Sequence, residues 1–506
     1  MLYNQNNTNN QSAKSRKALL LVFLFVSSLF VSLVPAVSAS HITQYAVQRD
    51  PSYISIGDLD CDGDNDIASA STMGLFITVL YNDGSGGFAD RQDVFISNND
   101  SRRAGFVDTA DGTRVEVADI DGDGVNDLVY YQQNIRFVGE SFVRPGNLTV
   151  LWGDCSERVN LWSDSEITVS NPFLSDMDVA DIDGDGNADI VMVVRDATST
   201  NQYIQIYKGP DPTLLTAQQT LAVPLTNGLY TNMMLGHYGE TVTGGGFPGG
   251  GGIGDCEDLD IWLLRTPPFN TGVGISVGHY DNMTVLEYDC LQGQYPNPMV
   301  AAPGVHEFKL DAEHNEPLYG IDIKDTDGNG EIDLIAAIDG LTGNISYAFG
   351  SGTSWSTQNY AYLGDFKGAS ITIEDVNNDG KYDFFVPTEL TLTRTQDSSS
   401  QNQTFLLLEN LREINSVEII LGKSDGSYLP SLSFDVGRRP TMAQPGQLQG
   451  GVDSAFEIVI GQRDYAYRFA NNAMWLDTQG WPGAGDFLSV LSLDNEDVGI
   501  TDVTVA

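Results

Sequence analysis

The sequence of 506 residues has few basic side chains, with 25 Lys and Arg against 69 Asp and Glu and a formal net charge of −44. Nucleic-acid binding depends on a basic surface, so this charge balance argues against a nucleic-acid partner. Only five histidines and four cysteines occur, and neither residue type has the spacing of a zinc site. Beyond one N-terminal run, no segment is apolar and long enough to cross a membrane.

The N-terminal run has the composition of a secretory signal. Basic residues precede an apolar core at residues 18–34, and Val37-Ser-Ala39 fits a small-residue cleavage site. We predict that residues 1–39 are a signal peptide, with an uncleaved membrane anchor as the alternative. The protein is then secreted or held at the cell surface, and it touches a membrane only through such an anchor.

A short acidic cassette occurs five times in the sequence, with oxygen-bearing side chains mainly at positions 1, 3, 5 and 9. Such glycine-containing loops suit calcium, a hard cation that takes oxygen ligands, and a divalent cation offsets the repulsion between the carboxylates. We therefore predict about five structural Ca²⁺ sites. The predicted ligands are Asp58, Asp60, Asp62, Asp64 and Asp66; Asp119, Asp121, Asp123 and Asp127; Asp181, Asp183, Asp185 and Asp189; Asp325, Asp327, Asn329 and Asp333; and Asp375, Asn377, Asp379 and Asp383.

Two other interpretations fit the cassette less well. An EF-hand needs an acid at position 12 and flanking helices. Position 12 is instead Ser69, Tyr130, Met192, Ala336 or Pro387. The flanks are short runs rich in β-branched and aromatic residues, which predict strands. The second interpretation, acidic hairpin turns that need no metal, explains one copy better than five with the same spacing.

A second landmark, an apolar strand ending in a turn, indicates how many repeats there are. It occurs seven times, at residues 76–84, 148–154, 204–209, 283–289, 345–350, 417–422 and 465–471. Two repeats therefore have degenerate loops, one between His237 and Asp260 and one at Gly450–Glu457. Motifs that return every 50 to 75 residues predict an all-β, seven-bladed β-propeller over residues 40–506. Blades are expected to begin near residues 50, 113, 175, 230, 317, 369 and 440.

The acidic loops, together with turns such as Asn82-Asp-Gly-Ser-Gly-Gly-Phe88, resemble the FG-GAP/VCBS type of β-propeller repeat, which is related in architecture to the integrin α-subunit head. The resemblance implies calcium between the first and second strands of each blade with an intact loop. The other integrin-head signatures are not clear here, so no integrin-like partner is implied.

Closure of the ring has two candidate strands. Residues 41–48 or Phe487–Ser492 supply the outer strand of the last blade, and an eighth partial unit at the C-terminus is a further alternative.

The cysteines predict two disulfides, because four of them occur in an exported protein. Three pairings are possible. Loops at the same end of a propeller can meet, so we expect Cys61–Cys155 between the first two blades and Cys256–Cys290 within the fourth.

The predicted function is a secreted calcium-binding module for binding or adhesion to an extracellular protein or glycan. A Gly-rich insert at residues 244–254 is a candidate recognition loop. No catalytic constellation is found, so no enzymatic activity is predicted. The alternatives are an extracellular polysaccharide lyase or hydrolase and a calcium-bridged surface-layer or matrix component.

Overall fold

Every described element is a β-strand, as the short apolar runs predict. Among these residues no helix is long and apolar enough to cross a membrane. The computed structural model describes residues 41–47, 51–71, 76–95, 114–133, 136–138, 141–143, 146–155, 158–169, 172–196, 201–209, 217–224, 229–238, 259–266, 282–289, 292–298, 304–310, 318–339, 344–351, 354–356, 359–362, 367–368, 370–376, 379–389, 416–436, 440–446, 448, 457–462, 466–470, 473–477 and 487–492.

The first three sheets each come from one continuous stretch of chain, and all their pairings are antiparallel. Sheet 1 contains β2 (Pro51–Gly57), β3 (Asp66–Ser71), β4 (Phe76–Tyr81) and β5 (Asp90–Phe95). Sheet 2 contains β6 (Arg114–Ala118), β7 (Asp127–Gln133), β10 (Gly146–Asp154) and β11 (Arg158–Val169), with a separate hairpin of β8 (Arg136–Val138) and β9 (Ser141–Val143). Sheet 3 contains β12 (Pro172–Ala180), β13 (Asp189–Asp196), β14 (Asn201–Tyr207) and β15 (Gln219–Pro224).

The next three sheets are built in the same way. Sheet 4 contains β16 (Leu229–Gly236), β17 (Asp260–Thr266), β18 (Asn282–Leu286) and β19 (Val305–Lys309). Sheet 5 contains β20 (Leu318–Lys324), β21 (Leu334–Asp339), β22 (Asn344–Ser351), β23 (Ser354–Trp355) and β24 (Asn359–Tyr362). Sheet 6 contains β25 (Lys367–Gly368), β26 (Thr372–Glu374), β27 (Asp383–Glu389), β28 (Ser416–Ile420) and β29 (Leu432–Asp435).

Sheet 7 joins the two ends of the described chain. It contains β30 (Pro440–Gly446), β31 (Glu457–Gln462), β34 (Phe487–Ser492) and β1 (His41–Ala46) in that order. Both candidate closing strands are therefore used, β34 as the third strand and β1 as the outermost. The seventh copy of the repeated strand, expected at residues 465–471, is not part of sheet 7. Among the described residues, β32 (Ala466–Ala470) pairs with β33 (Ala473–Asp477) in a separate hairpin.

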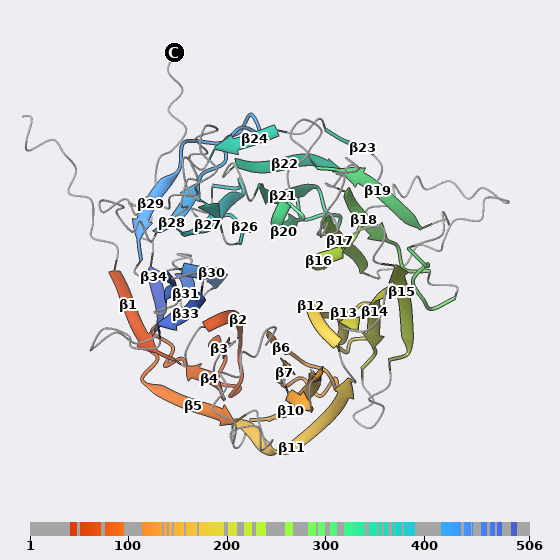
Figure 1. The fold of residues 1–506 in the computed structure, drawn as a ribbon. Helices are drawn as coiled ribbons and strands as arrows, with labels where there is room; N and C mark the ends of the chain where they lie inside the picture. Colours follow the sequence, from red (N-terminus) through yellow and green to blue (C-terminus); the bar gives the residue numbers. More distant parts are fainter. Residues whose placement is uncertain are drawn as a thin grey trace, which may run out of the picture.

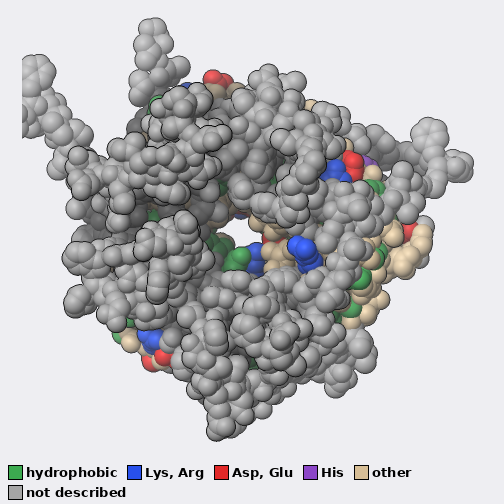
Figure 2. Space-filling model, viewed as in Figure 1, with side chains coloured by type: hydrophobic (Ala, Val, Ile, Leu, Met, Phe, Trp, Pro, Cys, Tyr) green, Lys and Arg blue, Asp and Glu red, His purple; other side chains and the backbone are tan. Residues whose placement is uncertain are grey.

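The sheets are arranged around a common centre with their first strands innermost, so the fold is a β-propeller (Figure 1). Figure 2 shows the hollow at the centre of the ring and basic side chains beside it. Five first strands carry a register shift near their start, which increases local twist. These shifts lie in β2, β12, β16, β20 and β30.

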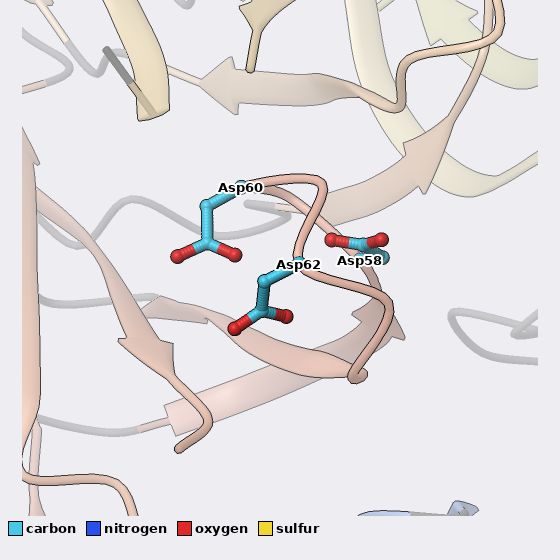
Figure 3. A group of neighbouring side chains, drawn as sticks. All are labelled: Asp58, Asp60 and Asp62. Carbon is cyan, nitrogen blue, oxygen red and sulfur yellow. The ribbon is translucent and has the colours of Figure 1, made fainter. Parts of the chain in front are cut away.

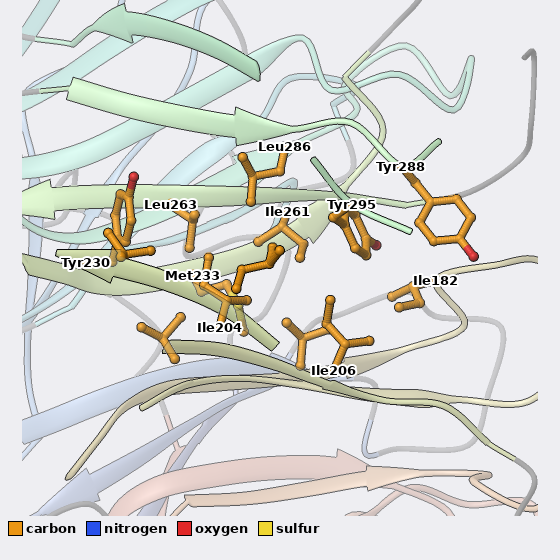
Figure 4. Close-up of a cluster of buried hydrophobic side chains, with 14 residues drawn as sticks. Ile182, Ile204, Ile206, Tyr230, Met233, Ile261, Leu263, Leu286, Tyr288 and Tyr295 are labelled. Atoms are coloured by element: carbon orange, nitrogen blue, oxygen red, sulfur yellow. The ribbon is translucent and has the colours of Figure 1, made fainter. Parts of the chain in front are cut away.

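Each pair of neighbouring sheets encloses a cluster of buried apolar side chains. Figure 4 shows the cluster between sheets 3 and 4, where Ile204 and Ile206 face Ile261 and Leu263. A corresponding cluster between sheets 7 and 1 includes Val459, so the apolar contacts run around the whole ring. Burial of this kind is the main favourable contribution to folding, and it fixes the loops on a rigid frame.

Candidate metal centres

The five acidic loops occupy equivalent places, between the first and second strands of sheets 1, 2, 3, 5 and 6. Equivalent connections lie on the same side of a propeller, so the loops form a ring of acidic groups there. The loop of sheet 6 is described except for Asn377 and its neighbour Asn378.

The first acid of each loop organises the backbone. Its Oδ2 accepts a hydrogen bond from the N–H of the glycine at position 6, which has a positive φ of 76–95° in all five loops. The N···O distances are 3.0 Å for Gly63–Asp58, 2.8 Å for Gly124–Asp119, 2.8 Å for Gly186–Asp181, 2.7 Å for Gly330–Asp325 and 2.8 Å for Gly380–Asp375. The loops are therefore closed by their own side chains.

Four of the loops gather three carboxylates each, with oxygen atoms within 4.8 Å of one another. The groups are Asp58, Asp60 and Asp62; Asp119, Asp121 and Asp127; Asp181, Asp183 and Asp189; and Asp325, Asp327 and Asp333. Figure 3 shows the first group, whose three side chains all come from one loop. Among the described residues, the predicted carboxylate ligands Asp64, Asp66, Asp123, Asp185, Asp375, Asp379 and Asp383 are not part of such a group.

The acid at position 9 joins two segments of its sheet. The two oxygens of Asp66 accept hydrogen bonds from the N–H of Leu59, next to the first acid, and from the N–H of Asn82, just after the third strand, at 2.8 Å each. Three further acids accept the same pair of bonds at 2.7–3.2 Å: Asp127 from Ile120 and Gly153, Asp189 from Ile182 and Gly209, and Asp383 from Val376 and Gly422. We call this arrangement the carboxylate bracket.

Burial of the bracket carboxylates raises their pKa above the usual range, despite the N–H groups that favour the ionised form. The pKa rises to about 7 for Asp66, Asp189 and Asp383 and to about 6 for Asp127. Neighbouring loop carboxylates add to the effect. A divalent cation beside these groups would reverse it, because the cation favours the charged form.

Sequence reasoning missed a complete bracket in sheet 4 and one bond of a bracket in sheet 7, the two sheets whose loops are degenerate. Asp260 in sheet 4 accepts the N–H groups of Tyr238 at 2.7 Å and Tyr288 at 3.0 Å, and Glu457 in sheet 7 accepts the N–H of Leu448 at 3.0 Å. A signal was present, because each acid directly precedes an apolar second strand, as Asp66 does. A complete bracket therefore also occurs in sheet 4, whose described residues hold no acidic cluster.

Hydrogen bonds also connect the loops of successive sheets. The N–H of Ala188 donates to the carbonyl of Asp119 at 2.8 Å, and the side chain of Asn126 donates to the carbonyl of Asp58 at 2.9 Å. His237, which stands where sheet 4 lacks the first acid, accepts the N–H of Ile332 at 2.8 Å through its carbonyl. A conformational change in one loop therefore alters a hydrogen bond of the neighbouring loop.

The acidic groups fit a hard cation. Oδ1 of Asp58 and Oδ1 of Asp183 are buried oxygens without a hydrogen-bond partner among the described residues, a costly arrangement for a carboxylate. In sheet 3 a lysine partly compensates the charge of this carboxylate, because Lys208 Nζ lies 2.7 Å from the other oxygen, Oδ2, of Asp183. Carboxylate oxygens alone, without sulfur or imidazole, are the ligands that calcium prefers.

Comparison with known proteins identifies no family for this chain. No family model matches the chain, and no curated protein matches it in sequence. Similar solved structures include the Dos1 propeller (7% identity, 89% of this chain and 94% of that chain covered, TM-score 0.41) and a putative 6-phosphogluconolactonase from Bacteroides fragilis NCTC 9343 (10%, 91% and 98%, 0.41). A functionally unknown protein from Desulfotomaculum acetoxidans DSM 771 is also similar (12%, 84% and 98%, 0.39). These likenesses are too distant to carry an argument about ligand or activity.

The disulfide Cys61–Cys155 is confirmed, with a Cα–Cα distance of 5.2 Å, and it links the acidic loop of sheet 1 to sheet 2. Cys61 occupies position 4 with φ of 60°, where Gly122, Gly184 and Gly328 have φ of 69–74°. The cross-link therefore holds a non-glycine residue in a left-handed conformation. Cys256 and Cys290, residues 1–39 and the insert at 244–254 lie outside the described residues.

This geometry predicts a difference between two variants that both lack the disulfide. The Cys61→Ser/Cys155→Ser protein should lose about 2–4 kcal/mol of unfolding free energy. The Cys61→Gly/Cys155→Ser protein should lose about 1 kcal/mol less than that, because glycine adopts positive φ without strain. Urea unfolding in calcium measures both values. Equal losses would show that position 4 does not need a left-handed residue.

Proposed function

We propose that this chain is an exported, calcium-stabilised β-propeller of the FG-GAP/VCBS type whose seven sheets serve as blades. It would bind or adhere to an extracellular protein or glycan. The observation that carries the calcium part is the set of clustered carboxylates with buried, unpartnered oxygens at Asp58 and Asp183. The disulfide supports export, because such bonds persist in oxidising compartments.

Calcium would be structural in this proposal. In the first loop Asp58, Asp60 and Asp62 would hold the ion, and in three other loops the acids at positions 1, 3 and 9 would do so. The loop that begins at Asp375, whose position 3 lies outside the described residues, would hold the fifth ion. Asp127 and Asp189 begin the second strands of their sheets and Asp333 directly precedes its second strand, while the other acids lie nearer to the first strand, so the ion would tie the two innermost strands together. Extracellular calcium sites of this kind bind with dissociation constants of roughly 0.1–1 mM.

The binding role is tested with calcium-loaded protein immobilised on a surface and probed with arrays of glycans and extracellular proteins. We expect a ligand whose affinity falls about tenfold or more after chelation, because the loops that position the binding surface loosen. Calcium-dependent self-assembly without any ligand would favour a matrix component instead. Turnover of a polysaccharide in the same screen would replace the binding role with an enzymatic one.

A further inference from the structure

A pocket of about 390 Å³ lies between sheets 5 and 6, on the side of the acidic loops. Sheet 5 contributes Thr326 and Phe349, and sheet 6 contributes Lys381, Tyr382, Lys423 and Tyr428. The volume falls within the range of roughly 300–1,000 Å³ that is usual for small-ligand sites.

The aromatic side chains that line the pocket are held in place by contacts with other aromatic rings. Tyr428 stacks on the buried ring of Phe384, with centroids 4.1 Å apart, and meets Tyr347 edge-on at 4.8 Å. The Tyr347 ring also contacts Phe349 at 5.9 Å. Rigid aromatic faces of this kind bind the flat apolar side of a ring at little entropic cost.

The rim of the pocket is basic, which is unusual in a chain with 25 Lys and Arg against 69 Asp and Glu. The charge of Lys423 helps to lower the pKa of Asp425, but no hydrogen bond from its Nζ occurs among the described residues. Lys381 Nζ lies 3.3 Å from Oδ2 of Asp379, a long contact for an ion pair. Thr326 Oγ1 donates to Asp333 at 2.6 Å, so its remaining lone pairs are acceptors for a ligand hydroxyl.

The equivalent groove is bridged between two other pairs of sheets. Between sheets 1 and 2 it is spanned by Cys61–Cys155, and between sheets 3 and 4 Lys208 bridges Asp183 and the hydroxyl of Tyr288. In sheets 5 and 6 the positions equivalent to the two cysteines are Gly328 and Ser424. Gly328 is at position 4 of its loop, as Cys61 is, and Ser424 lies two residues after the bracket partner Gly422, as Cys155 lies two residues after Gly153. Neither can form a cross-link. Beside the pocket the two sheets are joined by Lys324, whose Nζ lies 2.6 Å from Oε2 of Glu374 and 5.6 Å from the centroid of the Tyr382 ring, which adds a third cation to the site.

We propose that the pocket between sheets 5 and 6 binds one uronic-acid unit of an acidic glycan, with the sugar ring against Tyr382 and Tyr428 and the carboxylate on Lys423. This assignment rests on the proposed binding function and specifies its ligand class. Hydroxyl groups of the sugar would meet the polar rim. The acidic loops on both sides would need calcium to relieve their repulsion of the ligand.

The test is calorimetric titration of the calcium-loaded full chain with a tetrasaccharide of alternating glucuronate and N-acetylglucosamine, and with its carboxyl-reduced counterpart. Lys423→Gln should weaken binding of the acidic sugar about tenfold or more, because a charge-assisted hydrogen bond is lost, and should change binding of the reduced sugar less than about twofold. Tyr382→Leu should weaken both about tenfold. Arg91→Gln, which removes the same charge from β5 in sheet 1, is the matched control and should change neither.

The outcomes separate this assignment from the broader function. If the wild-type protein binds the acidic sugar and neither pocket variant alters the affinity, the site lies elsewhere and the pocket assignment is overturned while the binding function stands. If no sugar binds, the uronate assignment is overturned whatever the protein arrays show. Binding of a nucleotide in place of the sugar, with the same dependence on Lys423, would also overturn it. An unchanged unfolding midpoint in calcium shows that each variant is folded.

Discussion

Chelation of calcium is expected to lower the midpoint of thermal unfolding by about 5–12 °C relative to protein in about 5 mM calcium. A site with a dissociation constant of roughly 0.1–1 mM contributes RT ln(1 + [Ca²⁺]/Kd), which is about 1–2.3 kcal/mol. Five such loops supply about 5–12 kcal/mol. A chain of this length that unfolds as one unit shifts by about 1 °C per kcal/mol.

The stabilisation should be specific to calcium, and each site should contribute a separate part of it. Magnesium should restore little of the midpoint, because it demands a tight octahedral shell and dehydrates reluctantly. Asp121→Ala removes one ligand from a single cluster, so this variant should keep about four fifths of the calcium-dependent shift. An unchanged midpoint in the wild-type protein after chelation would mean that the loops are only acidic turns, and the calcium part of the proposal would fail.

Hydrogen bonds between the loops of successive sheets couple the loss of one calcium ion to the neighbouring site. Asn126 reaches the carbonyl of Asp58, and the N–H of Ala188 reaches the carbonyl of Asp119. If one loop opens after its ion leaves, its neighbour loses a hydrogen-bond acceptor. We therefore expect one cooperative transition rather than separate melting of the sheets.

The sequence predicted the repeating parts of the fold well because their signals are local. Alternating apolar runs beside acidic loops identify first and second strands, and Asp66-Ile67 marks such a boundary within two residues. Closure was harder, because β1 and β34 pair across almost the whole chain and no local pattern sets their order. The run at residues 465–471 was wrongly counted as a strand of the last sheet, because a strand of a separate hairpin has the same alternation of apolar and polar residues.

The sites were predictable only in part for a similar reason. Counting acids identifies the clusters at Asp119 and Asp181, but it treats position 9 as one more ligand and gives Asp260 no role. The bracket depends on burial and on N–H groups 22 and 28 residues away, which spacing does not reveal. The pocket combines Phe349 of sheet 5 with Tyr382 and Lys423 of sheet 6, so it has no sequence motif at all.

Replacement of Asp260 by alanine is expected to destabilise the protein by about 2–6 kcal/mol. The side chain is 9% exposed, and its removal leaves the N–H groups of Tyr238 and Tyr288 without acceptors in a buried site. Each unsatisfied buried group costs about 1–3 kcal/mol. Because sheet 4 has no acidic cluster among its described residues, the loss measured by urea unfolding should be the same in calcium and in chelator.

Asp189→Ala is the matched control, since Asp189 forms the same bracket but also belongs to an acidic cluster. Its loss should be larger in calcium than in chelator by the contribution of one ion, about 1–2.3 kcal/mol. The difference between the two variants thus separates the bracket from the metal site. Equal calcium dependence in both would show that Asp260 also serves a cation. A loss below about 1 kcal/mol for Asp260→Ala would mean that water replaces the carboxylate and the bracket contributes little.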